Sequence, residues 1–182
     1  STSRGLGDVY KRQVIGVMAW NTSRHLEVVY GVPGVGAVNH TLNPRLFSEQ
    51  LIYIINHAED KFLMVDPDLI PVIELIIAKC TSVQQIIVMT DTQNMPKSSI
   101  ENLLCYEEII SSEDTDMIWV KGSEYDACGI CYTSGTTGNP KGVVYTHRSN
   151  TLHALASAAP DMLGLASTER IMPVVPLFHA NG

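Results

Sequence analysis

Tyr132-Thr-Ser-Gly-Thr-Thr-Gly-Asn-Pro-Lys-Gly-Val143 is a glycine- and hydroxyl-rich segment between two apolar, strand-like runs. Residues 127–132 form the first run, which ends where the segment begins, and residues 143–145 form the second. Clusters of Ser, Thr, Gly and Pro usually form plain solvent-exposed turns. A plain linker would not usually sit directly between two strands in a chain otherwise poor in Ser/Gly tracts. The pattern therefore predicts a strand–loop–strand unit.

Strand and helix patterns alternate along the rest of the chain. Apolar and β-branched runs predict strands at residues 14–20, 35–41, 61–65, 85–89, 128–132, 143–146 and 170–175. Helical spacing predicts helices at about residues 23–30, 48–58, 69–80 and 149–163. Glycines and a proline at residues 31–36 are expected to end the first helix, and residues 91–99 to form a loop, while residues 100–120 give no clear pattern. This alternation predicts an α/β fold, a layered and mostly parallel sheet with flanking helices.

Composition bounds the class of protein. The chain has 182 residues, 45% of them hydrophobic and 17% charged, which is typical of one globular domain with a substantial core. A net charge of −7 without a basic cluster argues against a nucleic-acid partner. The most apolar run, residues 69–78, is shorter than the roughly 20 residues of a membrane span. With no apolar signal-peptide core near the N-terminus, we expect a soluble cytoplasmic protein.

The first 13 residues are interpreted as foreign to the domain. Asp8-Val-Tyr-Lys-Arg-Gln13 back-translates to GATGTGTATAAGAGACAG, the end sequence of a transposon used to prepare sequencing libraries. The chain also lacks an initiator Met and stops at Gly182 inside a motif. We therefore expect residues 1–13 to be a translated adapter and residues 14–182 to be a partial domain truncated at both ends. An uninterrupted upstream frame in longer DNA reads would contradict this.

The four cysteines include one Cys-x-x-Cys pair, Cys128 and Cys131, a spacing found in redox and zinc sites. No second pair at metal spacing accompanies it. On a strand, residues three apart point to opposite faces, so the two sulfurs would diverge. Buried structural thiols are the favoured interpretation.

The glycine-rich segment has the chemistry of a polyphosphate site. Ser134, Thr136 and Thr137 supply hydroxyls, and Lys141 supplies a positive charge. Glycines at positions 135, 138 and 142 leave the backbone open to a ligand, so that N–H groups can converge on anionic oxygens. A Walker A loop is excluded, because Lys141 follows Pro140 and precedes Gly142. The segment therefore predicts nucleotide phosphate binding.

This segment resembles the phosphate-binding signature of the adenylate-forming (AMP-binding) superfamily, which includes acyl-CoA synthetases, luciferases and the adenylation domains of peptide synthetases. Three further stretches resemble its fatty-acyl-CoA ligase branch: Met18-Ala-Trp-Asn-Thr-Ser-Arg-His-Leu-Glu27, Gly36-Ala-Val-Asn-His-Thr-Leu-Asn-Pro-Arg-Leu46 and Pro173-Val-Val-Pro-Leu-Phe-His-Ala-Asn181. The resemblance runs from about Val14 to the last residue. It implies part of the N-terminal domain of an acid–thiol ligase.

The resemblance implies ATP and coenzyme A as substrates with a fatty or medium-chain carboxylic acid, and Mg²⁺ as cofactor. It assigns nucleotide binding to Thr133, Ser134, Gly135, Thr136, Thr137, Gly138, Asn139, Pro140, Lys141, Gly142 and Ala180. Thr133 would also contribute to Mg²⁺ binding, and His179 would lie between the nucleotide and acyl pockets. It leaves a homodimer open.

Other family parts are absent: a Gly-Tyr-Gly-x-Thr-Glu-like motif, a Thr-Gly-Asp ribose motif and a C-terminal domain with a catalytic lysine. We expect them beyond Gly182, so we assign no complete catalytic group and expect this chain alone to form no acyl-adenylate. A luciferase-like or amino-acid-activating enzyme, or a nucleotide-binding module without catalysis, remains the alternative. His40, His57 and His153 fall within predicted elements without evident partners, and we assign them no role.

Overall fold

A computed structural model describes residues 12–116, 119–133, 139–172 and 174–179 of the chain. Within these residues, one sheet has the strand order β5-β4-β3-β1-β2-β6-β7. Its strands are β1 Val14–Met18, β2 Val38–Thr41, β3 Phe62–Val65, β4 Gln85–Val88, β5 Leu104–Cys105, β6 Ala127–Thr133 and β7 Lys141–Thr146. Neighbouring strands are parallel except β6 and β7, which pair antiparallel. The predicted α/β, mostly parallel sheet is confirmed.

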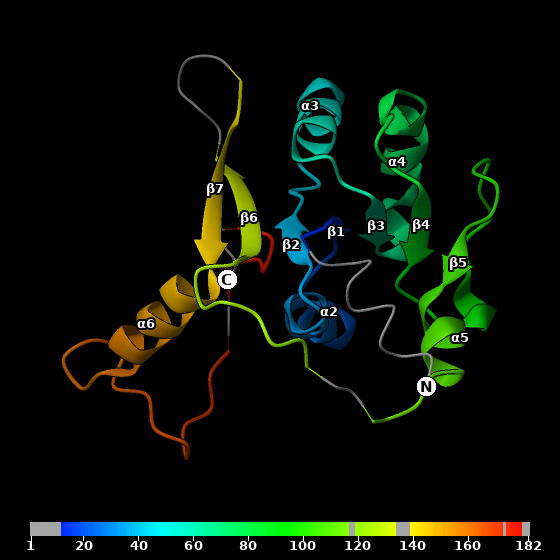
Figure 1. The fold of residues 1–182 in the computed structure, drawn as a ribbon. Coiled ribbons are helices and arrows are strands. Elements are labelled where there is room, and N and C mark those ends of the chain that lie inside the picture. Colours follow the sequence, from blue (N-terminus) through cyan, green and yellow to red (C-terminus); the bar gives the residue numbers. More distant parts are fainter. Residues whose placement is uncertain (1–11, 117–118, 134–138, 173, 180–182) are drawn as a thin grey trace.

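Helices cover both faces of this sheet, with α3 and α4 on one side and α2 and α5 on the other (Figure 1). The helices are α2 Ser23–Gly34, α3 Ser48–Ala58, α4 Ile70–Ile76, α5 Tyr106–Ser111 and α6 His147–Ala158, with short 3-10 turns at η1 Pro67–Leu69, η2 Ile77–Lys79 and η3 Thr92–Asn94. The predicted apolar stripe of α3 is buried at Leu51, Ile54 and Ile55. Each such side chain contributes about 1.5–3 kcal/mol on burial. None of the described helices is long and apolar enough to cross a bilayer.

Helix α2 is longer than predicted. Its N-cap is Thr22, whose hydroxyl accepts a hydrogen bond from the His25 amide at 3.2 Å. The helix continues through Gly31 and Pro33 to residue 34, because a proline in the last turn removes only one intrahelical hydrogen bond. Gly36 then adopts a left-handed φ of 81°, which turns the chain into β2. Strand β2 accordingly begins three residues later than predicted.

Other elements also differ from the sequence prediction, and the helix predicted at residues 69–80 is α4 Ile70–Ile76 followed by the 3-10 turn η2. Residues 100–120, which lacked a clear pattern, contain β5 and α5. Helix α6 begins at His147, where Thr146 caps it, and ends at residue 158 just before Pro160. The predicted strand at 170–175 is wrong, because the described residues of that stretch form no strand. Their β-branched side chains favour extended backbone, but strand propensity alone supplies no pairing partner, and none of the described strands pairs with them.

Candidate functional site

The predicted strand–loop–strand unit is an antiparallel hairpin of β6 and β7. Thr133 pairs with Lys141 across the hairpin, and Tyr132 pairs with Gly142. Thr133, Asn139, Lys141 and Gly142 are exposed, whereas Pro140 is buried. Of the other predicted nucleotide-binding residues, Ser134, Gly135, Thr136, Thr137, Gly138 and Ala180 lie outside the described part of the chain. The structure therefore pairs Thr133 with Lys141, two residues of the signature that lie on facing strands of the hairpin.

The hairpin extends past the carboxyl ends of the central strands. Val17 of β1 pairs with Thr41 of β2, and Thr41 pairs with Cys131 of β6, so these three residues form one row. Thr133 lies two residues beyond that row, and Trp20 lies three residues beyond it along β1. In open α/β sheets, ligands bind outside the carboxyl ends of the strands, where the strand order reverses. Here β1 is the reversal point, since β2 and β3 flank it.

Tyr132 is held tightly at the base of the hairpin. Its hydroxyl is hydrogen-bonded to His57 Nδ1 at 2.6 Å, and its ring centroid lies 5.0 Å from that of His40. Burial raises the pKa of Tyr132 to about 12, with a smaller contribution from the charge of Asp60, so the hydroxyl stays protonated and can donate. Opposite the ring, a Cβ at Gly142 would lie 3.1 Å from Tyr132 Cζ. Gly142 therefore leaves room for the Tyr132 ring, in addition to its predicted role in nucleotide binding.

Behind Tyr132 lies a buried polar pair, His40 on β2 and Asp60 just before β3. Nδ1 of His40 lies 2.9 and 3.0 Å from the two carboxylate oxygens, and neither side chain has exposed surface. Burial raises the pKa of Asp60, and the attraction of His40 opposes that rise. Among the described residues, His40 Nε2 has no hydrogen-bond partner. The pair supports the Tyr132 ring from the interior.

His179 lies in a segment that returns to the carboxyl edge of the sheet. Asn21 Nδ2 donates to the Val175 carbonyl at 3.1 Å, and the Leu177 amide donates to Asn21 Oδ1 at 2.7 Å. Phe178 is buried and packs edge-on against Trp20, with ring centroids 6.0 Å apart. His179 is exposed, and it follows a turn and not a strand, contrary to the sequence prediction.

The turn after β1 that carries Asn21 is itself firmly held. Asp66 accepts from the Trp20 amide at 2.8 Å, and Asp68 accepts from the Trp20 indole N–H at 2.9 Å. His25 Nδ1–H donates to the Trp20 carbonyl at 2.9 Å. Burial lowers the pKa of His25 and raises that of Asp66. The turn is thus tied to both β3 and α2.

Sequence reasoning missed these supporting residues. Asp60, His57 and Asn21 are 20, 75 and 154 residues from their partners His40, Tyr132 and Val175. No motif joins such positions. The only signal in the sequence was polar side chains placed inside or directly after apolar strands, where a buried polar group requires a partner. The expectation that His40 and His57 lack partners is therefore wrong.

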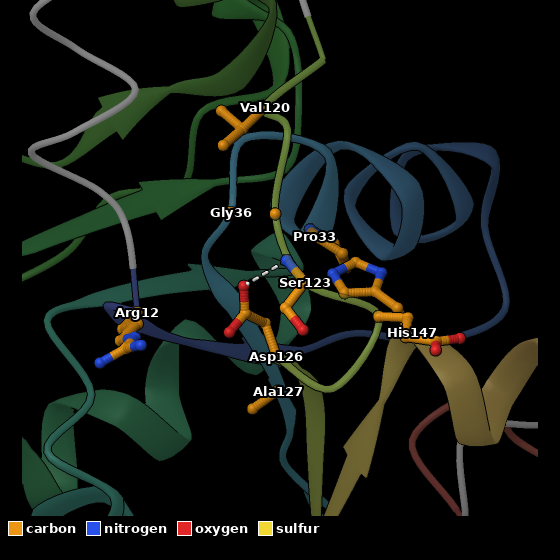
Figure 2. Close-up of a pocket in the computed structure, with 10 residues that line it drawn as sticks. Arg12, Pro33, Gly36, Val120, Ser123, Asp126, Ala127 and His147 are labelled. Atoms are coloured by element: carbon orange, nitrogen blue, oxygen red, sulfur yellow. Dashed lines mark hydrogen bonds between the residues drawn. The ribbon is translucent and has the colours of Figure 1, made fainter.

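A cavity of about 310 Å³ lies elsewhere, at the amino end of β6 (Figure 2). Ala127, Ser123 and Asp126 line it together with His147, and the Ser123 amide donates to Asp126 at 2.9 Å. It is at the opposite end of β6 from Thr133. Arg12, which also lines it, belongs to the segment interpreted as foreign. We therefore do not place the nucleotide there.

The four cysteines are free and buried, as predicted. Cys128 Sγ contacts the Tyr145 carbonyl at 3.5 Å and accepts from Asn150 Nδ2 at 3.3 Å. Burial raises the pKa of Cys80 to about 11 and also raises that of Cys128. These two thiols therefore stay protonated and unreactive at neutral pH.

Comparison with known proteins places this hairpin in context. A sequence profile described as AMP-binding enzyme matches residues 3–182. A medium-chain-fatty-acid–CoA ligase of Ectopseudomonas oleovorans is 47% identical over 164 residues, which cover 90% of this chain and 30% of that protein. A 3-methylmercaptopropionyl-CoA ligase of Ruegeria pomeroyi is 46% identical over 167 residues, which cover 92% of this chain and 31% of that protein.

Among solved structures, an anthranilate CoA ligase in complex with anthranoyl-AMP superposes with a TM-score of 0.84 at 25% identity. The match covers 97% of this chain and 32% of that one. The chain thus spans about 30% of the length of the curated relatives that it matches.

Proposed function

Because this chain belongs to the AMP-binding enzyme family, we propose that it is part of an ATP-dependent acyl-CoA ligase. The observation that carries the proposal is the β6–β7 hairpin, which pairs Thr133 with Lys141 within the phosphate-binding signature. Relatives that are 46–47% identical are CoA ligases, which supports this branch over luciferase-like or amino-acid-activating enzymes. The activity is proposed for the whole protein.

In the proposed reaction, a carboxylate oxygen of the acid attacks the α-phosphorus of ATP. The α–β phosphoanhydride bond breaks, so that acyl-adenylate forms and pyrophosphate leaves. The thiolate of coenzyme A then attacks the acyl carbonyl carbon, forms the thioester and releases AMP. Negative charge accumulates on the pyrophosphate in the first step, so a fixed cation and oriented N–H donors stabilise that transition state.

The residues of the signature supply those groups. Lys141 is exposed at the start of β7 and pairs with Thr133, which supports its assignment to the phosphates. We assign the β- and γ-phosphates to Lys141 together with Ser134, Gly135, Thr136, Thr137 and Gly138, with Asn139, Pro140 and Gly142 completing the segment. Ala180 would border the nucleotide, and His179 would lie between nucleotide and acid.

Mg²⁺ fits this site as an ion carried by the nucleotide. Mg²⁺ prefers oxygen ligands and commonly binds through one or two protein groups plus substrate phosphates. Thr133 offers an exposed hydroxyl at the end of β6, whereas the described residues hold no cluster of three His, Cys, Asp or Glu side chains that could bind a metal alone. Thr133 would be one ligand, and the ion would offset phosphate charge.

The acid is proposed more coarsely. A fatty or medium-chain acid agrees with the first of the two relatives, while the second acts on 3-methylmercaptopropionate, as its name states. The acids in the names of these two relatives are thus short to medium in length. A cytoplasmic location and a possible homodimer also belong to this proposal.

Titration with a non-hydrolysable ATP analogue tests the phosphate site. Lys141→Ala should weaken binding about 10- to 100-fold, because a hydrogen bond to a charged group contributes roughly 1.5–3 kcal/mol. Lys97→Ala is the matched control, since Lys97 is also exposed but lies in the loop after η3. Equal affinity of both variants would refute the phosphate assignment.

A second measurement tests the reaction class in the longest natural reading frame that contains residues 14–182. Carboxylate-dependent ATP–pyrophosphate exchange together with CoA thioester formation supports the ligase. Exchange without thioester would favour another adenylating enzyme, and neither would favour a binding module.

A further inference from the structure

We infer that Asn21 is a positioning residue for the acid-binding side of the site, because its side-chain amide clamps the segment that carries His179. This inference rests on the proposed ligase function. The clamp joins the turn after β1 to residues 175–177, at the strand where the sheet order reverses.

The clamp satisfies a donor and an acceptor with one side chain. Nδ2 donates to the Val175 carbonyl at 3.1 Å, and Oδ1 accepts from the Leu177 amide at 2.7 Å. Two bonds to residues i and i+2 of one segment set both its position and its direction. An aspartate at this position would keep only the acceptor, so the pair of bonds requires an amide.

The anchor of the clamp is rigid, so the segment follows the sheet. Trp20, the neighbour of Asn21, is held by Asp66, Asp68 and His25. On the other side, the Trp20 ring packs against Phe178, whose exposed fraction is 3%. One polar and one apolar contact therefore fasten adjacent residues of the returning segment to adjacent residues of the turn.

The clamp is connected directly to His179. The His179 amide donates to the Pro176 carbonyl at 2.9 Å, closing a turn over residues 176–179. Pro176 lies between the two residues that Asn21 holds. A shift of Leu177 therefore moves His179, while the β6–β7 hairpin belongs to a separate part of the edge. We expect loss of the clamp to weaken productive binding of the acid and to leave ATP binding nearly unchanged.

The chain contains a matched control at the opposite edge of the sheet. Asn56, in the last turn of α3, makes the same two bonds: Nδ2 donates to the Lys79 carbonyl at 2.8 Å, and the Thr81 amide donates to Oδ1 at 2.9 Å. Lys79 and Thr81 are also two residues apart, and they precede β4. Asn56→Ala therefore removes an equivalent pair of bonds that does not touch residues 175–179.

The test compares Asn21→Ala, Asn21→Asp and Asn56→Ala in the longest natural reading frame that contains the chain. Hydrogen–deuterium exchange of the Leu177 amide reads the clamp directly. We expect exchange to rise about tenfold in Asn21→Ala, to rise less in Asn21→Asp, which keeps the acceptor, and to stay unchanged in Asn56→Ala. Unchanged exchange in Asn21→Ala would overturn the clamp.

Kinetics with octanoate, ATP and CoA read the functional consequence. In Asn21→Ala, KM for octanoate should rise about tenfold while KM for ATP stays within about twofold, and Asn56→Ala should leave KM for octanoate unchanged. Equal increases in KM for octanoate and for ATP would overturn the inference, because Asn21 would then have a structural role only. An unchanged KM for octanoate despite faster exchange of the Leu177 amide would overturn it for the same reason. If the unsubstituted enzyme shows no acid-dependent turnover, the proposed function fails, and the exchange measurement still decides whether the clamp exists.

Discussion

Replacing His40 should destabilise the protein strongly, and a second substitution at Asp60 should partly restore it. In the structure, His40 Nδ1 is the hydrogen-bonding partner of both Asp60 carboxylate oxygens, at 2.9 and 3.0 Å, and both side chains are fully buried. The space around Asp60 is tight: a Cβ added at Gly16 would lie 2.7 Å from its Oδ2. Neither water nor a new partner can therefore replace the imidazole without rearrangement.

The magnitude follows from this burial. Removing one partner of such a buried pair costs about 3–5 kcal/mol, because the Asp60 carboxyl is left buried without its hydrogen-bond partner. For an m-value near 2 kcal/mol/M, His40→Leu should lower the urea midpoint by roughly 1.5–2.5 M. Asp60→Asn on top of His40→Leu replaces the carboxylate by a neutral amide, whose burial costs less. The double variant should therefore be more stable than His40→Leu alone.

Urea unfolding followed by far-UV circular dichroism at neutral pH measures the stability of the unsubstituted protein, the two single variants and the double variant, which together form a double-mutant cycle. In the presence of His40, Asp60→Asn alone should be destabilising, so the effect of the same substitution changes sign with its partner. If the double variant is less stable than His40→Leu, or if the two single effects add within about 0.5 kcal/mol, the buried pair is not coupled as the geometry requires.

Two further outcomes are expected. Gly142→Ala should cost roughly 1 kcal/mol and weaken ATP-analogue binding several-fold, because its Cβ would press on the Tyr132 ring, whereas Gly31→Ala, with nothing within 4 Å, should stabilise α2. Calorimetric titration and urea unfolding measure both, and equal effects would contradict the ring contact. Burial lowers the pKa of His25. Below about pH 6.5 the His25 side chain therefore takes up a proton in the unfolded chain, while it stays neutral in the folded protein. Stability should therefore fall as pH drops from about 6.5 towards the folded pKa, and His25→Gln should reduce the fall in the urea midpoint; an unchanged slope would contradict it.

Local patterns predicted most of the sheet, because apolar runs bounded by turn residues have few other ways to bury their side chains. Strands β1, β3, β4 and β6 lie within one or two residues of the prediction. The failures share a cause. Strand β5 has only two residues, and its pairing with β4 depends on a neighbour about 17 residues away, which no local window contains. The apolar run at 170–175 showed the reverse error, since strand propensity without a neighbouring strand produces no ladder.

The candidate site shows the same distinction between local sequence patterns and contacts of distant residues. The phosphate-binding signature is contiguous, so Lys141 could be proposed as a phosphate ligand from its residue type and its glycine-rich surroundings, and Thr133 could be proposed from the family resemblance. The residues that hold this segment in place could not be identified from the sequence. Tyr132 is held by His57 on α3 and rests on His40, and the geometry of that contact depends on how α3 packs over the sheet. Sequence therefore names the groups that would touch the ligand, and packing determines what holds those groups.

The two supports differ in kind, and this difference separates their functional consequences. The hairpin rests on the buried His40 of β2 and is hydrogen-bonded to the exposed His57 of α3, so damage to His40 or Asp60 should spread into the core and reduce stability together with nucleotide binding. The His179 segment is attached to a turn through the two Asn21 hydrogen bonds and the Trp20–Phe178 ring contact, and of residues 175–179 only Phe178 is buried. Such an attachment can loosen without unfolding the sheet. In the proposed ligase, substitutions at residues 175–179 should therefore alter acid binding at little cost to the fold, whereas substitutions at His40 or Asp60 should also destabilise the core.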